Sequence, residues 1–413
     1  MPTESALRPR QELVAWRNAI FVIFTLSGLS IATWAARLPE IKANLDVSTG
    51  SIGILILGMS AGSILGLMAS AWLMVRLGAR TGMVLSLGFV AIGLVLIGIG
   101  AGVVFSPVLV FLGLALFGFG NGSVDVMMNV EGAAAETELG KTVLPLMHAC
   151  FSLGTVIGAG IGAAASALEI GIVWHAGGMA VLIAAAVVTA VRFVPVREEL
   201  GDDTPTHSHK EDWKTRLRVN LSVWADLRLI LIGVIMLGMA FAEGSANDWL
   251  ALATVEGHGQ SQPTGAIVFG VFVSAMTLGR VAGGPLIDRF GRVRVLQVSA
   301  VSAIVGLIVF ILGPSLWIVV AGTVLWGLGS ALGFPLGMSA AAEGRNAAAR
   351  VSAVAMIGYL AFLVGPPLIG LLGDAIGLLN ALFVVLVLVI FSGLASPAAR
   401  EASSVPNADK PRA

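Results

Sequence analysis

The fourth apolar segment of this sequence carries a carboxyl side chain between two amides. Asn121, Asp125 and Asn129 are spaced four residues apart, so on a helix they form one stripe on one face. A charge in hydrocarbon is costly, and desolvation favours the neutral acid, which is the property that a proton carrier needs. The stripe predicts a cavity-lining face with Asp125 as a proton or cation site; polar contact between packed helices is the alternative.

His148 is the one histidine well inside an apolar segment, the fifth. It lies nine residues past a turn expected near Leu139, and Asn129 lies ten residues before that turn. At a rise of about 1.5 Å per residue the two reach a similar depth, with Asp125 one turn further in. A hydrogen-bonded relay is therefore geometrically feasible, and a histidine satisfied within helix packing is the alternative.

The seventh apolar segment supplies a second acidic candidate. Glu243 and Asn247 share one helical face, and Asp248 and Trp249 follow them. We expect Glu243 in the outer half of the membrane, as the rival of Asp125. Asp248 is expected near the outer interface, as a gate or interface group.

The first apolar segment presents a mixed polar and aromatic face. Ser27, Ser30 and Trp34 follow the i, i+3, i+7 spacing of one side of a helix, so they are candidates for a cavity wall. Arg37 continues this face outward. It is expected either to pair with Asp248 or to be solvated.

The second half of the chain is less polar. Phe334 and Tyr359 are candidates for apolar cavity surface, with ordinary helix packing as the alternative. Pro335 and the Pro-Pro pair at 366–367 each remove a backbone hydrogen bond and predict kinks. Arg280 is expected to extend toward the inner membrane face or to brace the loop that follows.

Composition indicates what must hold these side chains in place. Of 413 residues, 57% are hydrophobic and 12% are charged, whereas soluble domains carry about 25% charged residues. Lipid must be the solvent for much of this surface, and the net charge of 0 argues against a nucleic-acid partner. No ATP-binding loop, dinucleotide fingerprint, metal-ligand cluster or catalytic pair occurs, so we expect neither an enzyme nor a cofactor. The expected partners are a small-molecule solute, protons and lipid, around a monomer.

Twelve apolar runs are long enough to cross a bilayer of about 30 Å. They lie at 18–36, 50–74, 83–104, 108–132, 143–168, 172–194, 227–246, 264–287, 293–312, 316–341, 351–372 and 378–395. The domains expected are a six-helix half at 1–196, a linker at 197–226, a second half at 227–399 and a tail at 400–413. The fold class is an all-α membrane protein.

The basic residues predict the orientation of these helices. With the N-terminus inside, the outside loops hold only Arg37 and Lys42, and 22 of the 24 Lys and Arg residues lie in or beside inside segments. Cytoplasmic loops are enriched in Lys and Arg. Both termini are therefore predicted to be cytoplasmic, in the cell (inner) membrane.

The two halves share short repeated sequences. Residues 76–80 match 289–293 at an offset of 213, 133–136 match 340–343 at 207, and 33–34 match 248–249 at 215. Duplicated halves predict a solute site between them near the membrane midplane, opened to each side in turn.

The loop after the eighth segment resembles the signature loop of the major facilitator superfamily. Its pattern of Gly284, Asp288, Arg289, Gly291 and Arg292 matches Gly-x-x-x-Asp-Arg-x-Gly-Arg. The resemblance implies that these residues control conformation, with Asp288 holding two helix ends together.

The rest of the chain resembles the same superfamily. The more usual copy of the loop, after the second segment, is degraded at Ala71, Val75 and Ala79. Further stretches, at 33–40, 120–129, 242–249 and 358–367, are similar to the YbjJ-like branch related to fucose permeases. This resemblance implies a secondary transporter, expected to be proton-coupled, whose cargo is either sugar-like or otherwise polar, or drug-like.

Two other functions remain open from the sequence. The glycines of 154–162 partly resemble the motif of proton/drug antiporters, although Ala159 replaces its proline, and close helix packing explains them equally well. Efflux of drugs or metabolites is therefore an alternative. A solute sensor with a transporter fold is a second, since fold does not fix function.

Overall fold

Long apolar helices make up nearly all of the part of the chain that the computed structural model describes, residues 9–141, 143–195, 223–343 and 347–400. The first half contains α1 (Arg10–Ala35), α2 (Leu38–Leu45), α3 (Thr49–Gly102), α4 (Pro107–Leu139), α5 (Leu144–Ala167), α6 (Ile172–Ala190) and the 3-10 turn η1 (Val191–Phe193). The second half begins with the 3-10 turn η2 (Val223–Ala225) and continues through α8 (Leu227–Leu252), the π-helical turn η3 (Ala253–Gly257), α9 (Gln262–Phe290), α10 (Arg292–Leu312), α11 (Leu316–Ser330), α12 (Gly333–Ala341), α13 (Ala347–Ile376), α14 (Leu378–Ala395) and the 3-10 turn η4 (Ser396–Ala399). The predicted linker up to residue 222 and the tail beyond Arg400 lie outside the described residues.

Helix α3 contains two membrane spans. Eleven helical segments of the described residues are long and apolar enough to cross a membrane, and α3, with 54 residues, is one of them. At about 1.5 Å per residue it would measure about 80 Å, more than twice the bilayer core. Gly78 interrupts it with a positive φ of 73°. The expected count of twelve spans in an all-α membrane fold is thereby confirmed.

The turn at Gly78 recurs in the second half. Gly291, between α9 and α10, has φ 79° and ψ 155°, and Gly78 has φ 73° and ψ 160°. A side chain with a Cβ rarely adopts this backbone conformation, so glycine is needed at both places. The sequence repeat at an offset of 213 is therefore a repeat of local structure.

Three features of the helices add detail to the sequence-based expectation. The predicted span at 316–341 is divided into α11 and α12, because Pro335 has no N–H to donate to the carbonyl four residues earlier, at Ala331. The Pro-Pro pair at 366–367 does not interrupt α13, which continues to Ile376. The short helix α2, with Pro39 in its first turn, lies where a loop was expected.

Glycines allow helices of the first half to approach closely. A Cβ on Gly28 of α1 would lie 2.0 Å from the carbonyl oxygen of Phe151, and one on Gly154 of α5 would lie 2.1 Å from that of Thr25. Both are impossible distances, so small residues are required for α1 and α5 to pack backbone to backbone. This contact accounts for the start of the glycine motif at 154–162.

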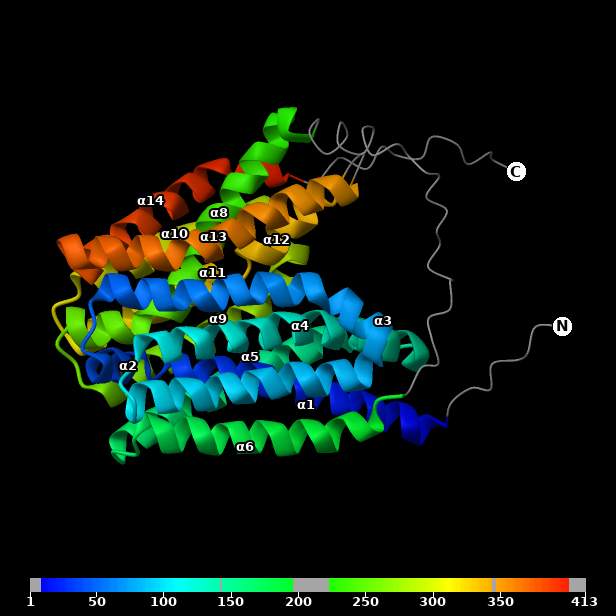
Figure 1. Cartoon of the computed structure of the whole chain (residues 1–413). Helices are drawn as coiled ribbons and strands as arrows, with labels where there is room; N and C mark the ends of the chain where they lie inside the picture. The colour runs from blue at the N-terminus through cyan, green and yellow to red at the C-terminus, as the bar shows by residue number, and fades with distance from the viewer. Residues whose placement is uncertain (1–8, 142, 196–222, 344–346, 401–413) are drawn as a thin grey trace, which may run out of the picture.

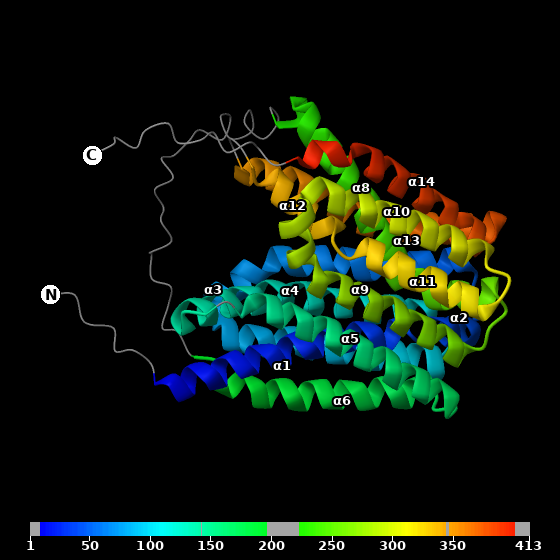
Figure 2. The same ribbon diagram turned by 180° about the vertical axis from the view of Figure 1, so that it is seen from behind.

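The bundle has two distinct ends (Figure 1). We name the end where α1 begins and α14 ends the proximal end, and the opposite end, where α2 lies, the distal end. Seen from either side, α6 and α14 lie at opposite edges, with α4, α5 and α9 between them (Figure 2). The functional candidates are thus placed on helices that face one another across the middle.

The two halves are fastened together at the distal end. Lys42 of α2 forms a 2.5 Å ion pair with Glu256 of η3. The Asp374 carboxylate of α13 accepts hydrogen bonds from the Ser48 side chain and from the first backbone N–H groups of α3. We name Lys42, Glu256, Asp374 and Ser48 the distal latch. Deeper in the bundle, the Ser60 hydroxyl of α3 donates to the Phe362 carbonyl of α13 at 3.0 Å.

Candidate functional site

Asp125 is exposed on α4 and faces the second half of the chain. The amide of Asn129, one turn further on, donates to the Asp125 carbonyl at 2.8 Å and reaches its carboxylate at 3.5 Å. Tyr359 of α13, which is also exposed, interacts electrostatically with Asp125. Among the described residues, no Lys or Arg forms an ion pair with Asp125. The site therefore holds a carboxyl group with an amide neighbour and without a cation.

Asn121 and the polar face of α1 lie in the packed contact between α1 and α4 in this conformation. The Ser27 hydroxyl donates to the side-chain oxygen of Asn121 at 2.8 Å, which joins α1 to α4. Ser30 donates to the Ser27 carbonyl at 2.7 Å, and Trp34 packs edge-on against Phe117. All three α1 side chains are buried. They do not line an open cavity here, which favours the polar-contact interpretation for Asn121.

His148 is exposed on α5 and close to the second half. Its ring packs edge-on against Phe24, with ring centres 5.0 Å apart, and it interacts electrostatically with Arg280 of α9. No hydrogen bond joins it to Asp125 or Asn129 within the described part of the chain. The predicted relay stays a prediction, but His148 and Asp125 belong to the same central region.

Arg280 forms an ion pair with Glu243 rather than extending to the inner face or bracing the loop. Its Nη2 lies 2.7 Å from Glu243 Oε1, which links α9 to α8. Arg280 is ten residues, or about 15 Å, from the end of α9, and every other described Lys or Arg lies nearer to an end of the bundle. The sequence did not identify this pair, because Glu243 and Arg280 are 37 residues apart on different helices.

Arg37 is neither solvated nor paired with Asp248. Its side chain is 2% exposed and forms an ion pair with Glu40. It also donates to the Ile170 carbonyl at 2.7 Å and lies 3.4 Å from His175 Nδ1. These contacts fasten the start of α2 to the turn between α5 and α6. The Arg-x-x-Glu spacing of residues 37 and 40 was the available sequence signal.

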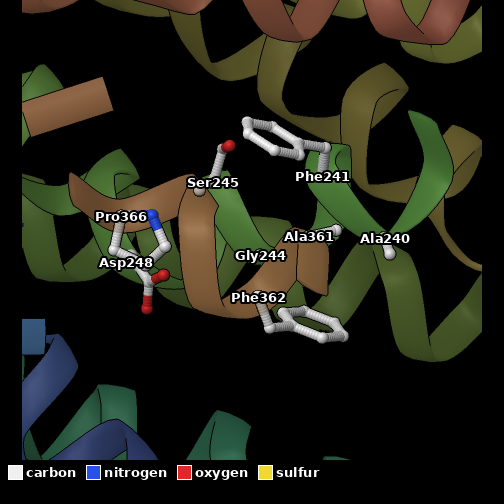
Figure 3. A pocket seen from close by; sticks show the side chains of 9 residues that line it. Ala240, Phe241, Gly244, Ser245, Asp248, Ala361, Phe362 and Pro366 are labelled. Carbon is white, nitrogen blue, oxygen red and sulfur yellow. The ribbon is translucent and has the colours of Figure 1, made fainter. Parts of the chain in front are cut away.

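Asp248 lines a narrow crevice between α8 and α13, and Figure 3 shows its carboxylate pointing away from the Phe241 ring. Asn247 beside it is half-buried, and Trp249 is fully buried at the contact with Gly370. Phe334 is half-buried near Gly358. Among these described residues, Asp248 is the one that lines the crevice, and the indole Nε1 of the buried Trp249 is a second polar group without a hydrogen-bond partner.

The signature loop uses a different acid from the one expected. Gly284, Asp288 and Arg289 are exposed, and within the described chain Asp288 has no hydrogen bond or ion pair. Instead, Glu343, just past α12, forms ion pairs with Arg292 at 2.7 Å and with Arg228 at 3.2 Å. The three helix ends meet at Glu343, the last residue of the repeated Ala-Ala-Ala-Glu sequence.

A second ion pair supports the same end of the bundle. Arg350 of α13 binds Asp226, which caps α8 by accepting the N–H of Arg228 at 2.9 Å. The hydrogen bond from Arg350 holds the pKa of Asp226 below its usual value. Together with Glu343, this pair joins α8, α10, α12 and α13 at their proximal ends.

We expect Glu343→Gln to destabilise the second half more than Asp288→Asn. The Gln side chain cannot balance Arg292 and Arg228, whereas Asp288 has no partner to lose. The difference should be about 1–3 kcal/mol, the range for a partly buried charge left unpaired. Thermal unfolding of the two purified variants measures it. Equal loss of stability would restore the role first expected for Asp288.

Comparison with known proteins identifies the family of this chain. A family profile described as Major Facilitator Superfamily matches residues 20–278 and 249–412. The uncharacterized transporter y4wD of Sinorhizobium fredii is 29% identical over 91% of this chain and 96% of its own. The finer branch expected from the sequence, that of the fucose permeases, is not established by these matches.

Solved transporter structures share the fold. A crystal structure of the nucleoside transporter NupG superposes with a TM-score of 0.70, at 18% identity, over 94% of this chain and all of that one. The transporter FucP, in an outward conformation, gives a TM-score of 0.61 at 14% identity, over 95% of this chain and all of that one. With twelve spans, a superfamily match over nearly the whole sequence and a transporter among its relatives, this multi-pass membrane protein belongs to the Major Facilitator Superfamily.

Proposed function

We propose that this protein is a proton-coupled secondary transporter that moves a small polar solute across the cell (inner) membrane. The observation that carries the proposal is Asp125, a carboxyl group without a cation at mid-depth, opposite Tyr359 of the other half. A carboxyl group in such a place would favour its protonated form when the halves close over it and exclude water, and its ionised form when water reaches it. Proton binding and release at Asp125 would then accompany solute movement.

The arrangement of the halves supports alternating access. The distal latch and the bond from Ser60 to Phe362 hold the distal ends together, while Asp125, His148 and Tyr359 remain exposed. This is the arrangement expected of a transporter closed distally and open toward its proximal end. Opening the distal end would require the latch to break.

The chemistry of the site favours a solute with hydroxyl or amide groups. Asn129 and Tyr359 supply neutral hydrogen-bonding groups, and the Arg280–Glu243 pair supplies charges that already balance each other. NupG, which shares the fold, is a nucleoside transporter, and nucleosides are polar and uncharged. A sugar-like or nucleoside-like cargo is therefore proposed ahead of drug efflux, because Gly154 and Gly158 of the stretch first compared with the antiporter motif pack against α1.

Flux in proteoliposomes tests the proposed function. With an imposed pH gradient, the purified protein should concentrate a radiolabelled nucleoside or sugar, and collapsing the gradient should abolish the accumulation. A panel of neutral, cationic and anionic solutes identifies the cargo class. Binding of a solute without any flux would instead favour a sensor.

Reporter fusions test the proposed orientation. Fusions after Gly140 and Val293 should report a cytoplasmic location, and fusions after Gly102 and Gly257 an external one. The reason is the 22-to-2 distribution of basic residues, which favours a cytoplasmic proximal end. An inverted reporter pattern would refute this orientation and, with it, the cytoplasmic placement of both termini.

A further inference from the structure

Asp248 lies in a recess whose walls are shared with the contact between the halves. The crevice is lined by residues of α8 and α13: Ala240, Phe241, Gly244, Ser245, Asp248, Ala361, Phe362, Gly365 and Pro366. Two of these residues also touch α3 of the other half. The Phe362 carbonyl accepts the Ser60 hydrogen bond, and a Cβ on Gly53 would lie 2.7 Å from the Pro366 carbonyl. Separation of α3 from α13 would therefore also change the crevice (Figure 3).

No cation balances Asp248. Among the described residues, its carboxylate has no ion pair and no hydrogen bond, and its surroundings are two aromatic rings, a proline and small side chains. The crevice offers one other polar side chain, the buried Ser245. An ionised carboxylate is strongly disfavoured in such surroundings, and a neutral carboxylic acid is tolerated far better.

The charged groups on the neighbouring elements are already engaged. Away from the proximal ends of α8 and α9, where Arg228, Asp288 and Arg289 lie, they are Glu243 and Arg280, which pair with each other. Arg37 and Glu40 pair at the start of α2, Lys42 of α2 pairs with Glu256 of η3, and Asp374 of α13 binds the start of α3. In the described ranges, α11, α12 and α14 carry no charged side chain. Every basic side chain of the distal half thus has an acidic partner other than Asp248.

The equivalent position of the first half is uncharged. Thr33 of α1 corresponds to Asp248 at the repeat offset of 215, and its hydroxyl donates to the Leu29 carbonyl at 2.9 Å. Thr33 satisfies its polar group within its own helix, whereas Asp248 does not. The acid is therefore not a requirement of the shared helical framework.

We propose that Asp248 is a second proton-binding site, which links proton binding to closure of the distal end. This inference rests on the transport function proposed above, because it assigns to Asp248 the control of one gate. With the distal end closed, the crevice holds the neutral acid. Loss of the proton would leave a carboxylate that needs water, and separation of α3 from α13 would admit water. Low pH therefore favours the closed distal end, and high pH favours the open one.

Distances across the distal end test this proposal without any solute. Spin labels at Ala43→Cys and Ala375→Cys, two exposed positions at the distal ends of α2 and α13, are introduced in a Cys150→Ser background. Pulsed electron paramagnetic resonance in lipid nanodiscs then gives the closed and open fractions. Between about pH 5 and about pH 9, the open fraction should rise at least about fivefold.

Asp248→Asn, which mimics the protonated acid, should keep the distal end closed throughout this pH range. Asp46→Asn is the matched control: it removes one carboxylate from the same end of the bundle, and asparagine tolerates the positive φ of 50° at that position. It should retain the pH response of the parent protein. A pH-independent distance in the parent, or an unchanged pH response in Asp248→Asn, would overturn the proposal. Absence of flux in proteoliposomes would contradict the transport function alone, because the distances are measured without solute.

Discussion

Arg280→Gln is expected to destabilise the protein and to reduce transport at least about tenfold. The substitution leaves Glu243 inside the helix bundle without its cation, and loss of one partner of a fully buried pair costs about 3–5 kcal/mol. The Arg280 side chain is 31% exposed, so we expect a smaller loss, about 2 kcal/mol. Transport should fall because the substitution also removes the electrostatic interaction between Arg280 and His148 in the central region.

A double substitution distinguishes the effect of an unpaired charge from the effect of changing the Arg280 side chain itself. Arg280→Gln combined with Glu243→Gln removes both charges and leaves two amides that can bond to each other. It should recover most of the lost stability, to within about 1 kcal/mol of the parent, since no unpaired charge remains. Thermal unfolding of both single variants and the double variant completes the cycle. Arg294→Gln, at an exposed position of α10, is the control for loss of a guanidinium.

The cycle also distinguishes two roles for Arg280. Recovered stability without recovered transport would mean that the charge itself is needed in the central region. Recovery of both would mean that the pair only fastens α8 to α9. A double variant as unstable as the single ones would contradict the ion pair as a source of stability.

The spans and their repeat could be predicted from the sequence because each depends on local pattern. Apolar length identifies a membrane helix, and the similar turns at Gly78 and Gly291 follow from the repeated Arg-x-Gly. The break before α12 was also signalled, by Pro335. Each of these features depends only on residue types that lie within a few positions of one another in the sequence.

The charge pairs could not be predicted in the same way. Arg280 with Glu243, Arg292 with Glu343 and Lys42 with Glu256 all join different helices. Their formation depends on the rotation and depth of each helix, which the pattern along one helix leaves open. Asp288 illustrates the difference: the motif marks the loop correctly, yet the partner of Arg292 comes from a helix end more than fifty residues away.

For the candidate site, the sequence identified the acids but not their states. The sequence placed Asp125 and Glu243 inside apolar segments and Asp248 near the outer interface, but it did not show which side chains surround each acid. The structure distinguishes them: Glu243 pairs with Arg280, Asp125 is exposed beside the amide of Asn129, and Asp248 lines a narrow crevice. Glu243 is the one of the three whose carboxylate forms an ion pair within the described residues, with Arg280.

Asp125→Asn is expected to abolish uphill transport driven by a pH gradient and to retain downhill exchange. At one proton per solute, a difference of one pH unit is worth about 1.4 kcal/mol, which supports about tenfold accumulation. Asparagine resembles the protonated acid in shape and hydrogen bonding but cannot release a proton. The accumulation ratio should fall from about ten to about one, while counterflow of labelled solute continues.

The same proteoliposomes measure both quantities, with Asp46→Asn as the control for a lost carboxylate. Counterflow is the decisive comparison, because a misfolded protein would lose it together with accumulation. Asp125 is also the acid that faces Tyr359 of the other half, so its proton and the solute would share one region. Accumulation at the parent level in Asp125→Asn would contradict the assignment. If Asp248→Asn lost accumulation but kept counterflow, while Asp125→Asn kept both, the proton that drives uptake would belong to the distal crevice, and the coupling site would lie on α8 rather than α4.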